Sequence, residues 1–442
     1  MGPTGRRVTA MKVLLISTNV ATTPYPTYPL GLSMIAAAIE RAGHEVFQFD
    51  FLQHGESVDA LIAAIREQKP ELVGISIRNI DTTNFFREKR YIDGVKAVVA
   101  RIREATNARI VLGGSGFSIM PEEILREVGA DYGVVGEGES LIADFVTGAA
   151  KGEYPSERLL RSEPHLRGGE IPSASYDRGM LDFYLKGGSL ASVQTKRGCT
   201  HRCAYCSYPV LEGATIRERE PAAVVGDIRG LVERHGVKYV FFTDSVFNDD
   251  AGHFRAVVDE LQKSGPRVPW TAFFKPGGLD DAVIEQMKET GLKAAELGSD
   301  ASTDTTLRAL GKSFLFKDVI ECNDQFQRHG VATAHYFMFG GPGETPATVA
   351  EGIENLKRLQ KTVIFVFMGI RILPGTTLAE IALRDGVIQP DQSLLDPVYY
   401  IAPAVDRKWM EEALTKGFEG QRHIVFPPDS FDNALRLLHK MG

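Results

Sequence analysis

Three of the four cysteines of this chain lie in one short segment, and their spacing restricts what the segment can form. Cys199, Cys203 and Cys206 follow a Cys-x-x-x-Cys-x-x-Cys pattern. Three thiolates leave a tetrahedral metal ion one ligand short, whereas a cubane iron–sulfur cluster can be held through three irons while the fourth takes another ligand. A structural zinc site would need His201 as its fourth ligand, and a disulfide is disfavoured by the close spacing. The pattern therefore favours a 4Fe-4S cluster.

The segment from Arg197 to Ser207 resembles the signature loop of the radical S-adenosylmethionine (SAM) superfamily. The resemblance includes an aromatic residue, Tyr205, directly before the third cysteine. It implies that SAM binds the open iron and is cleaved by an electron from the cluster to a 5′-deoxyadenosyl radical, while the protein positions the cofactors. It also implies that Tyr205 flanks the adenine of SAM.

Length and composition limit the other possibilities. A chain of 442 residues is too long for one average domain, and 43% hydrophobic with 24% charged residues is ordinary globular composition. A net charge of −7 without a basic stretch disfavours nucleic acid as the main partner. The apolar runs are too short to span a bilayer, no export signal is recognisable, and the few clustered cysteines fit a reducing compartment. We therefore expect a cytoplasmic protein with no transmembrane segment.

Residues 11–150 alternate between strand-like and helix-like segments. We expect buried strands at 12–17, 45–49, 72–76, 109–112 and 132–135, and helices at 30–41, 58–67, 92–104, 121–128 and 140–149. This alternation predicts an α/β domain with a doubly wound parallel sheet, which binds ligands at the carboxyl ends of its strands.

The loops at those carboxyl ends carry small or rigid residues. Taken alone, their glycines could equally form tight turns. Together, and ahead of a radical SAM loop, they resemble the cobalamin-binding domain of cobalamin-dependent radical SAM enzymes. The resemblance implies that a cobalamin site is lined by Tyr28, Ser76, Gly113, Gly114, Gly136 and Glu137.

One departure from other cobalamin domains concerns the cobalt ligand. Domains of the mutase type carry a cobalt-ligating histidine in the loop after the first strand, and residues 18–23 contain none. His44 begins the second strand, where we expect only a polar residue at a strand start. Any bound cobalamin is therefore expected to lack a protein imidazole on its cobalt.

Prolines and glycines break the alternation over residues 151–188, which we interpret as a linker packed against both domains. Six strand–helix units follow within 189–390, with strands expected at 190–195, 239–243, 270–274, 294–298, 331–339 and 363–372. Six units predict a partial (β/α)6 barrel with its active site at the carboxyl ends of the strands, which is the architecture of radical SAM enzymes. Residues 391–442 are predicted to form a C-terminal helical extension, with helices near 409–417 and 431–440.

The same strand ends carry the predicted SAM site. The resemblance implies contacts with SAM for Tyr205, Asp244, Glu296, Asp300, Gly340, Gly341 and Glu344. From the residues alone, Asp244 could equally cap a loop, together with Asn248. Glu296 lies on an otherwise apolar strand, where burial is costly without a partner. No catalytic acid or base is assigned, and Cys322 is expected in the core of a helix.

These features together indicate a cobalamin-dependent radical SAM enzyme with a 4Fe-4S cluster, SAM and cobalamin as cofactors. The simplest function is C-methylation of an unactivated carbon in a small-molecule or lipid substrate, with electrons from a donor such as flavodoxin or ferredoxin. One alternative is oxidative cyclisation or rearrangement without methyl transfer. An alternative of another class is a cobalamin- or redox-sensing binding protein whose cluster is not catalytic.

Overall fold

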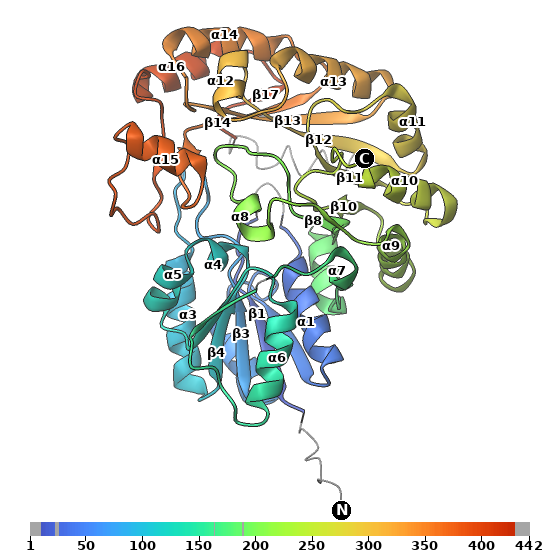
Figure 1. Cartoon of the computed structure of the whole chain (residues 1–442), viewed down its shortest axis with the longest axis vertical. Helices are drawn as coiled ribbons and strands as arrows, with labels where there is room; N and C mark the ends of the chain where they lie inside the picture. Colours follow the sequence, from blue (N-terminus) through green and yellow to red (C-terminus); the bar gives the residue numbers. More distant parts are fainter. Residues whose placement is uncertain (1–9, 23–25, 163, 188–189, 429–442) are drawn as a thin grey trace, which may run out of the picture.

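The computed structural model describes residues 10–22, 26–162, 164–187 and 190–428, which form two α/β domains (Figure 1). The helix predicted near 431–440 lies outside the described residues. The longest described helix, α9 (Pro221–His235), has 15 residues, and no helix among the described residues is long and apolar enough to cross a bilayer.

The first domain is built on a six-stranded parallel sheet with strand order β2-β1-β3-β4-β5-β6. Its strands are β1 (Lys12–Ser17), β2 (Glu45–Asp50), β3 (Leu72–Ser76), β4 (Arg109–Gly113), β5 (Tyr132–Val135) and β6 (Leu159–Arg161). The first five confirm the predicted strands. The register pairs Ser17 with Ser76 and Ser76 with Gly113, so the carboxyl ends of the three central strands are level.

Helices cover both faces of this sheet, as a doubly wound fold requires. On one face α1 (Leu30–Arg41) packs against α6 (Glu139–Ala149), and on the other α3 (Ile92–Ala105) packs between α2 (Val58–Gln68) and α5 (Pro121–Val128). In α1 the buried Leu32, Ala36 and Ile39 recur at helical spacing on the sheet side. A short helix that was not predicted, α4 (Ser115–Ile119), follows β4.

The predicted linker contains structure of its own. Its strand β6 pairs with β5 and so extends the first sheet beyond residue 150. The 3₁₀ helix η1 (Gly168–Glu170) and helix α7 (Arg178–Lys186) follow. The segment contacts both domains, since the Ser175 amide donates to the Ser33 carbonyl at 2.9 Å and the Tyr176 hydroxyl to the Ser192 carbonyl at 2.8 Å.

The second domain is an open barrel on a parallel sheet with strand order β17-β14-β13-β12-β11-β10-β7. Its strands are β7 (Ala191–Val193), β10 (Val240–Phe242), β11 (Trp270–Phe274), β12 (Leu292–Asp300), β13 (Ala332–Phe339), β14 (Val363–Met368) and β17 (Ile424–Val425). Six of them confirm the predicted partial barrel, and β17 is an addition that was not predicted. The short pairs β8 (Lys196–Arg197) with β9 (Arg217–Glu218) and β15 (Ile370–Arg371) with β16 (Tyr399–Tyr400) lie in its loops.

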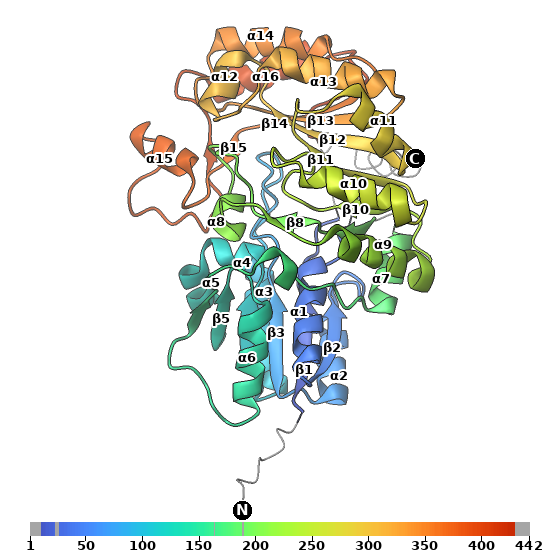
Figure 2. The ribbon, with the colours of Figure 1, turned by 45° about the vertical axis from the view of Figure 1, so that its right-hand side comes forward.

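The barrel sheet has a covered outer face and a concave inner face. Above the sheet in Figure 1 lie α12 (Asp304–Ala309), α13 (Phe316–Arg328) and α14 (Pro346–Lys357), with α10 (His253–Ser264) and α11 (Asp281–Glu289) toward its other edge. The first domain lies below it in both views (Figures 1 and 2). Further helices are α8 (Tyr208–Glu212), α15 (Thr377–Arg384) and α16 (Arg407–Gly417), the last confirming the helix predicted near 409–417.

Candidate active site

The three-cysteine loop leaves β7 and is fixed on both sides by backbone hydrogen bonds. Gly198 has φ +86°, and a Cβ atom there would clash with the carbonyl oxygen of Thr215, so only glycine allows this passage. Within the loop, the Ala204 amide donates to the Leu310 carbonyl at 2.9 Å, and the Ala204 carbonyl accepts from the Leu378 amide at 2.7 Å. The loop is therefore held between the end of α12 and the start of α15.

The cysteines of this loop fit a cubane better than a single metal ion. All three are free thiols, with Cys199 buried and Cys203 and Cys206 half-buried. In the part of the chain that the structure describes, no three His, Cys, Asp or Glu side chains are arranged to hold one metal ion, which disfavours the zinc alternative with His201. A cubane needs no such convergence, because each thiolate binds a different iron. Burial raises the pKa of Cys206 to about 12, so this thiol stays neutral until iron binds its sulfur.

A buried lysine that was not predicted lies beside the loop. Lys312 Nζ is 3.1 Å from Cys203 Sγ and 3.2 Å from the Tyr205 hydroxyl, and it forms an ion pair with Asp300. Burial lowers the pKa of Lys312, but the Asp300 carboxylate raises it further, so the ammonium stays charged. A fixed positive charge at this point offsets the negative charge of three thiolates.

The structure brings only part of the predicted SAM set to the cysteine loop. Tyr205 and Asp300 meet there through Lys312. Asp244 is buried, accepts from the Thr195 amide at 2.7 Å and pairs with Lys196 Nζ at 3.3 Å. These contacts are the ones expected if Asp244 caps a loop. A contact between Asp244 and SAM stays a prediction.

Asn248, the partner of Asp244 in that alternative, also has structural contacts. Its amide nitrogen donates to the Lys275 and Gly277 carbonyls, each at 3.0 Å. Both residues thus hold loops at the carboxyl edge of the barrel.

The glycine-rich loop after β13 is also closed by its own contacts. Glu344 accepts from the Gly340 amide at 3.2 Å and from the Thr348 hydroxyl at 2.8 Å, and burial raises its pKa to about 7. A Cβ atom at Gly341 would lie 3.2 Å from the Ile370 side chain. The SAM contacts of Gly340, Gly341 and Glu344 therefore remain predictions.

Glu296 differs from these residues because it faces the concave side of the barrel. One carboxylate oxygen accepts from the Tyr336 hydroxyl at 2.8 Å, and the other, buried, has no hydrogen-bond partner among the described residues. Burial raises the pKa of Glu296 to about 7, although the Tyr336 hydrogen bond acts in the opposite direction.

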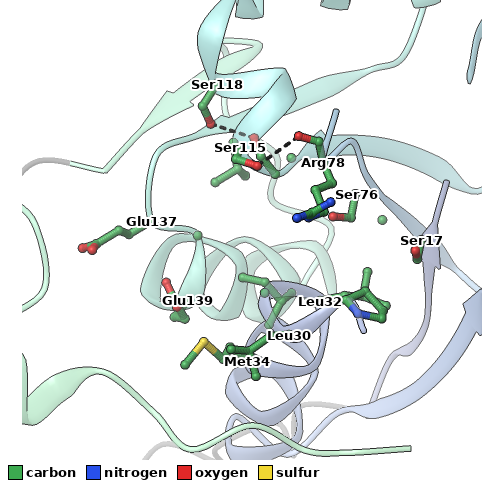
Figure 3. Close-up of a pocket in the computed structure, with 18 of the residues that line it drawn as sticks. Ser17, Leu30, Leu32, Met34, Ser76, Arg78, Ser115, Ser118, Glu137 and Glu139 are labelled. Atoms are coloured by element: carbon green, nitrogen blue, oxygen red, sulfur yellow. Dashed lines mark hydrogen bonds between the residues drawn. The ribbon is translucent and has the colours of Figure 1, made fainter. Parts of the chain in front are cut away.

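A cavity of about 340 Å³ lies at the carboxyl ends of the first sheet (Figure 3). It opens where strand order reverses between β1 and β3, as marked by Ser17 and Ser76, and doubly wound sheets bind ligands at such a point. All six residues predicted for the cobalamin site line it: Tyr28, Ser76, Gly113, Gly114, Gly136 and Glu137. Gly114 adopts φ +98°, and a Cβ there would lie 2.6 Å from the Ile77 carbonyl oxygen. The backbone conformation and the close approach of Ile77 therefore also require glycine at this position.

The second domain supplies the other wall of this cavity, which the sequence analysis did not foresee. Its residues are Ser192, Gln194, Arg197, Tyr208, Leu211, Glu212 and Thr243. Tyr208 begins α8 only two residues after Cys206. The cavity is therefore shared between the first sheet and the cysteine loop.

Buried charges connect the two walls. Arg197 pairs with Glu139 at 2.5 Å and with Glu137 at 3.3 Å, and Arg217 Nη1 donates to Glu137 at 2.8 Å. Burial alone would raise the pKa of Glu137, but the two arginines lower it overall, so its carboxylate stays ionised. Arg78 also lines the cavity and forms no ion pair with the described residues; Figure 3 shows its guanidinium near Ser76.

His44 lies at the amino end of β2, away from this cavity. Its ring nitrogens contact the Met11 amide and the Thr147 hydroxyl, each at 3.2 Å. This confirms His44 as a polar residue at a strand start. Among the described residues, the lining of the cavity contains no histidine.

Comparisons with known proteins match both domains. A B12 binding domain model matches residues 16–146, and a radical SAM superfamily model matches residues 193–356. Tryptophan 2-C-methyltransferase of Streptomyces laurentii is 26% identical over 432 residues, covering 80% of this chain and 72% of that protein. Cytidylyl-2-hydroxyethylphosphonate methyltransferase of Streptomyces wedmorensis is 23% identical and covers 88% and 84%.

Solved structures show the same fold over nearly the whole chain. The radical S-adenosylmethionine methyltransferase TsrM from Kitasatospora setae, with cobalamin and a [4Fe-4S] cluster bound, has a TM-score of 0.84 at 22% identity and covers 98% of this chain and 99% of its own. The cobalamin-dependent enzyme OxsB has a TM-score of 0.73 at 14% identity and covers 93% of this chain and 67% of its own. With its B12 binding domain followed by a radical SAM domain, the chain belongs to the cobalamin-dependent radical SAM enzyme family.

Proposed function

We propose that this protein is a cobalamin-dependent radical SAM methyltransferase that transfers a methyl group from SAM to a carbon of a small-molecule substrate. The observation that carries the proposal is the shared wall of the cavity. Residues on both sides of the cysteine loop, Arg197 before it and Tyr208 after it, line the same cavity as Ser76 and Gly113 of the first sheet. A methyl carrier in this cavity would lie next to the SAM site.

The residues present fit these cofactors. When bound, the cluster and cobalamin supply electron transfer to SAM and a methyl-carrying metal, respectively. Lys312 holds a positive charge beside Cys203, and Gly113 leaves open space at the sheet edge for a large planar ligand. The ion pair between Arg197 and Glu139 keeps the two walls at a fixed separation. The two methyltransferase relatives cover 80% and 88% of this chain, which supports methyl transfer as the function.

The cysteines and the net charge of the chain bear on its compartment and its partners. The four cysteines are free thiols, which supports a reducing cytoplasm. Reduction of the cluster would come from an external donor such as flavodoxin or ferredoxin. The net charge of −7 supports a partner other than nucleic acid.

The test uses the full chain reconstituted anaerobically with iron, sulfide and hydroxocobalamin. We expect S-adenosylhomocysteine to form from SAM under reduction, in a cobalamin-dependent manner, and a methyl label to leave SAM. Release of deoxyadenosine without S-adenosylhomocysteine would favour cyclisation or rearrangement. If SAM stays intact, the binding-protein alternative replaces the enzyme.

A further inference from the structure

Strand β12 departs from its regular pairing with β13 just before it ends. Leu297 pairs with His335 and Asp300 pairs with Phe337, so three steps along β12 match two steps along β13. One extra residue is therefore inserted in β12, which makes this strand end a β-bulge. A bulge changes the direction in which the neighbouring side chains point.

Asp300, the last residue of β12, has an uncommon backbone conformation. Its φ is +63°, and among the described residues it is the only non-glycine residue in a strand with positive φ. Such a conformation is unfavourable for a residue with a Cβ atom and persists only where the surrounding contacts hold it. In this conformation the Asp300 carboxylate forms an ion pair with Lys312, whose ammonium lies 3.1 Å from Cys203 Sγ. The shape of the bulge therefore bears on where this positive charge lies relative to the cysteine loop.

A buried chain of hydrogen bonds ties the bulge to the outer helices. Ser299 Oγ, inside the bulge, lies 2.8 Å from His335 Nδ1, and His335 Nε2 lies 3.2 Å from Asn323 Oδ1. Asn323 belongs to α13, which covers the outer face of the sheet (Figure 1). None of the three residues is more than 1% exposed, so bulk water does not replace a partner that is lost here.

The direction of each hydrogen bond in this chain is fixed. Asn323 Nδ2 donates to the Gln360 carbonyl at 3.2 Å, so the amide end that faces His335 is Oδ1, which only accepts. His335 Nε2 must therefore carry a proton. Burial lowers the pKa of His335 to about 3, so the ring is neutral and its Nδ1 is an acceptor. The Ser299 hydroxyl consequently donates to His335.

We propose that Ser299 and His335 are positioning residues that hold the bulge of β12 in the shape that keeps Asp300 on Lys312, and that they thereby hold a positive charge beside the cluster-binding Cys203. Neither side chain hydrogen-bonds to the cysteine loop among the described residues, so their effect on the cluster passes through Asp300 and Lys312. The proposal goes beyond methyl transfer, because it requires only that the cysteine loop binds a cluster.

The test is the reduction potential of the cluster in the reconstituted full chain, measured by potentiometric titration with electron paramagnetic resonance. Ser299→Ala removes one hydroxyl group and should lower the potential, in the same direction as Lys312→Met, because the ammonium is no longer held beside Cys203. His335→Phe should lower it as well, and its ring can keep the stacked arrangement with Phe337, whose centroid is 6.0 Å from that of His335. This second variant keeps the test decisive if Ser299→Ala fails to fold.

Thr333→Val is the matched control. Thr333 lies on the same buried face of β13 as His335, and its hydroxyl donates to the same Asn323 Oδ1 at 2.9 Å. Its loss weakens the same network at a position outside the bulge, so this variant should keep the potential of the parent even where its free energy of unfolding is lower. Equal shifts in Thr333→Val and Ser299→Ala would mean that the network has only a general structural role, and the proposal would be wrong.

A double variant shows whether the effect passes through Lys312. Adding Ser299→Ala to Lys312→Met should leave the potential of Lys312→Met unchanged, because the charge is already absent. A further decrease would overturn the proposal, as would an unchanged potential in Ser299→Ala with the cluster retained, or a parent chain that binds no cluster.

S-adenosylhomocysteine formation in the same samples tests the methyltransferase function separately. If the potentials shift as expected but no methyl group leaves SAM, the positioning role stands and the function is wrong. If methyl transfer occurs but the potential of Ser299→Ala equals that of the parent, the function stands and the positioning role is wrong.

Discussion

Arg197 Nη2 lies 2.5 Å from Glu139 Oε1, and this ion pair joins the two domains across the shared cavity. Arg197 precedes Cys199 by two residues, and Glu139 is the first residue of α6. Both side chains are only 8% exposed. The position of the cysteine loop relative to the first sheet therefore depends on a pair of charges that water barely reaches.

Breaking this pair on one side should destabilise the protein. Arg197→Met leaves Glu139 buried without its main cation, which typically costs about 3–5 kcal/mol. Glu139→Gln should also destabilise the protein. The double variant should lose less free energy of unfolding than the two single variants together, because it leaves no unpaired charge. Urea unfolding of the three variants gives the coupling energy, and additive losses would contradict a direct interaction.

The cluster ligands can be tested by single substitutions. Replacing Cys199, Cys203 or Cys206 by alanine should abolish the visible absorbance of a reconstituted cluster with about four irons per chain. Cys322→Ala is the matched control, since Cys322 is fully buried in the core beside Phe326. Loss of the cluster in Cys322→Ala would show that the three-ligand assignment is wrong.

Lys312 should set the reduction potential of the cluster. Its ammonium lies 3.1 Å from Cys203 Sγ, where a positive charge favours the more negative, reduced state. Lys312→Met should lower the potential by on the order of tens of millivolts, whereas Lys312→Arg should restore most of it. Potentiometric titration followed by electron paramagnetic resonance measures both, and equal potentials in the Met and Arg variants would exclude a role for the charge.

Structural features that neighbouring residues encode were predicted from the sequence, whereas features that depend on contacts between distant residues were not. Runs of valine, isoleucine and leucine predicted β1 and β3 because a strand buried on both faces must be apolar throughout. Strand β6 was not predicted because its three residues, Leu159–Arg161, are too few to form a recognisable apolar run. The six residues predicted for the cobalamin site all line one cavity, because small residues at strand ends are a local signal in the sequence.

Features that depend on tertiary contacts were missed for a physical reason. A lysine after a short helix is usually solvated, and only the fold places Lys312 between Asp300 and Cys203. Asp244 has the sequence context of a ligand-binding carboxylate, but the fold brings Lys196 to it. The face to which Tyr336 points follows from strand alternation only once the barrel curvature is known.

A side chain at Gly113 should block the cavity at the carboxyl ends of the first sheet, where we predict that cobalamin binds. A Cβ atom at this position would meet nothing closer than the Val134 carbonyl oxygen at 3.8 Å, so Gly113→Leu projects into the cavity without disturbing the sheet. We expect loss of hydroxocobalamin binding with the cluster retained, measured by gel filtration and absorbance. Gly94→Leu, on the exposed face of α3, is the matched control.

His44→Ala should bind hydroxocobalamin with an unchanged spectrum, because His44 contacts Met11 and Thr147 instead of the cavity. A changed spectrum would mean that this imidazole reaches the cobalt. A parent protein that cleaves SAM but does not bind cobalamin would mean that the first domain keeps the fold without the cofactor.

Glu296 should make stability fall as pH rises through neutrality. Burial raises the pKa of Glu296 to about 7 from its ordinary value of 4.5, so the folded state binds this proton more tightly than the unfolded state. The stabilisation is fully present below about pH 4.5 and is lost as pH rises through 7, by up to roughly 3 kcal/mol. Tyr239, whose pKa burial raises, stays neutral over this range.

The measurement compares the free energies of unfolding of the parent and Glu296→Gln between about pH 5 and 8.5. Glutamine does not titrate, so the free energy of unfolding of the variant should rise relative to that of the parent across this range. At the upper end the variant should be the more stable protein. Glu157→Gln, an exposed residue, should follow the parent at every pH. A difference between the parent and Glu296→Gln that does not change with pH would mean that Glu296 is already ionised in the folded protein at pH 5, and that its free oxygen has a partner.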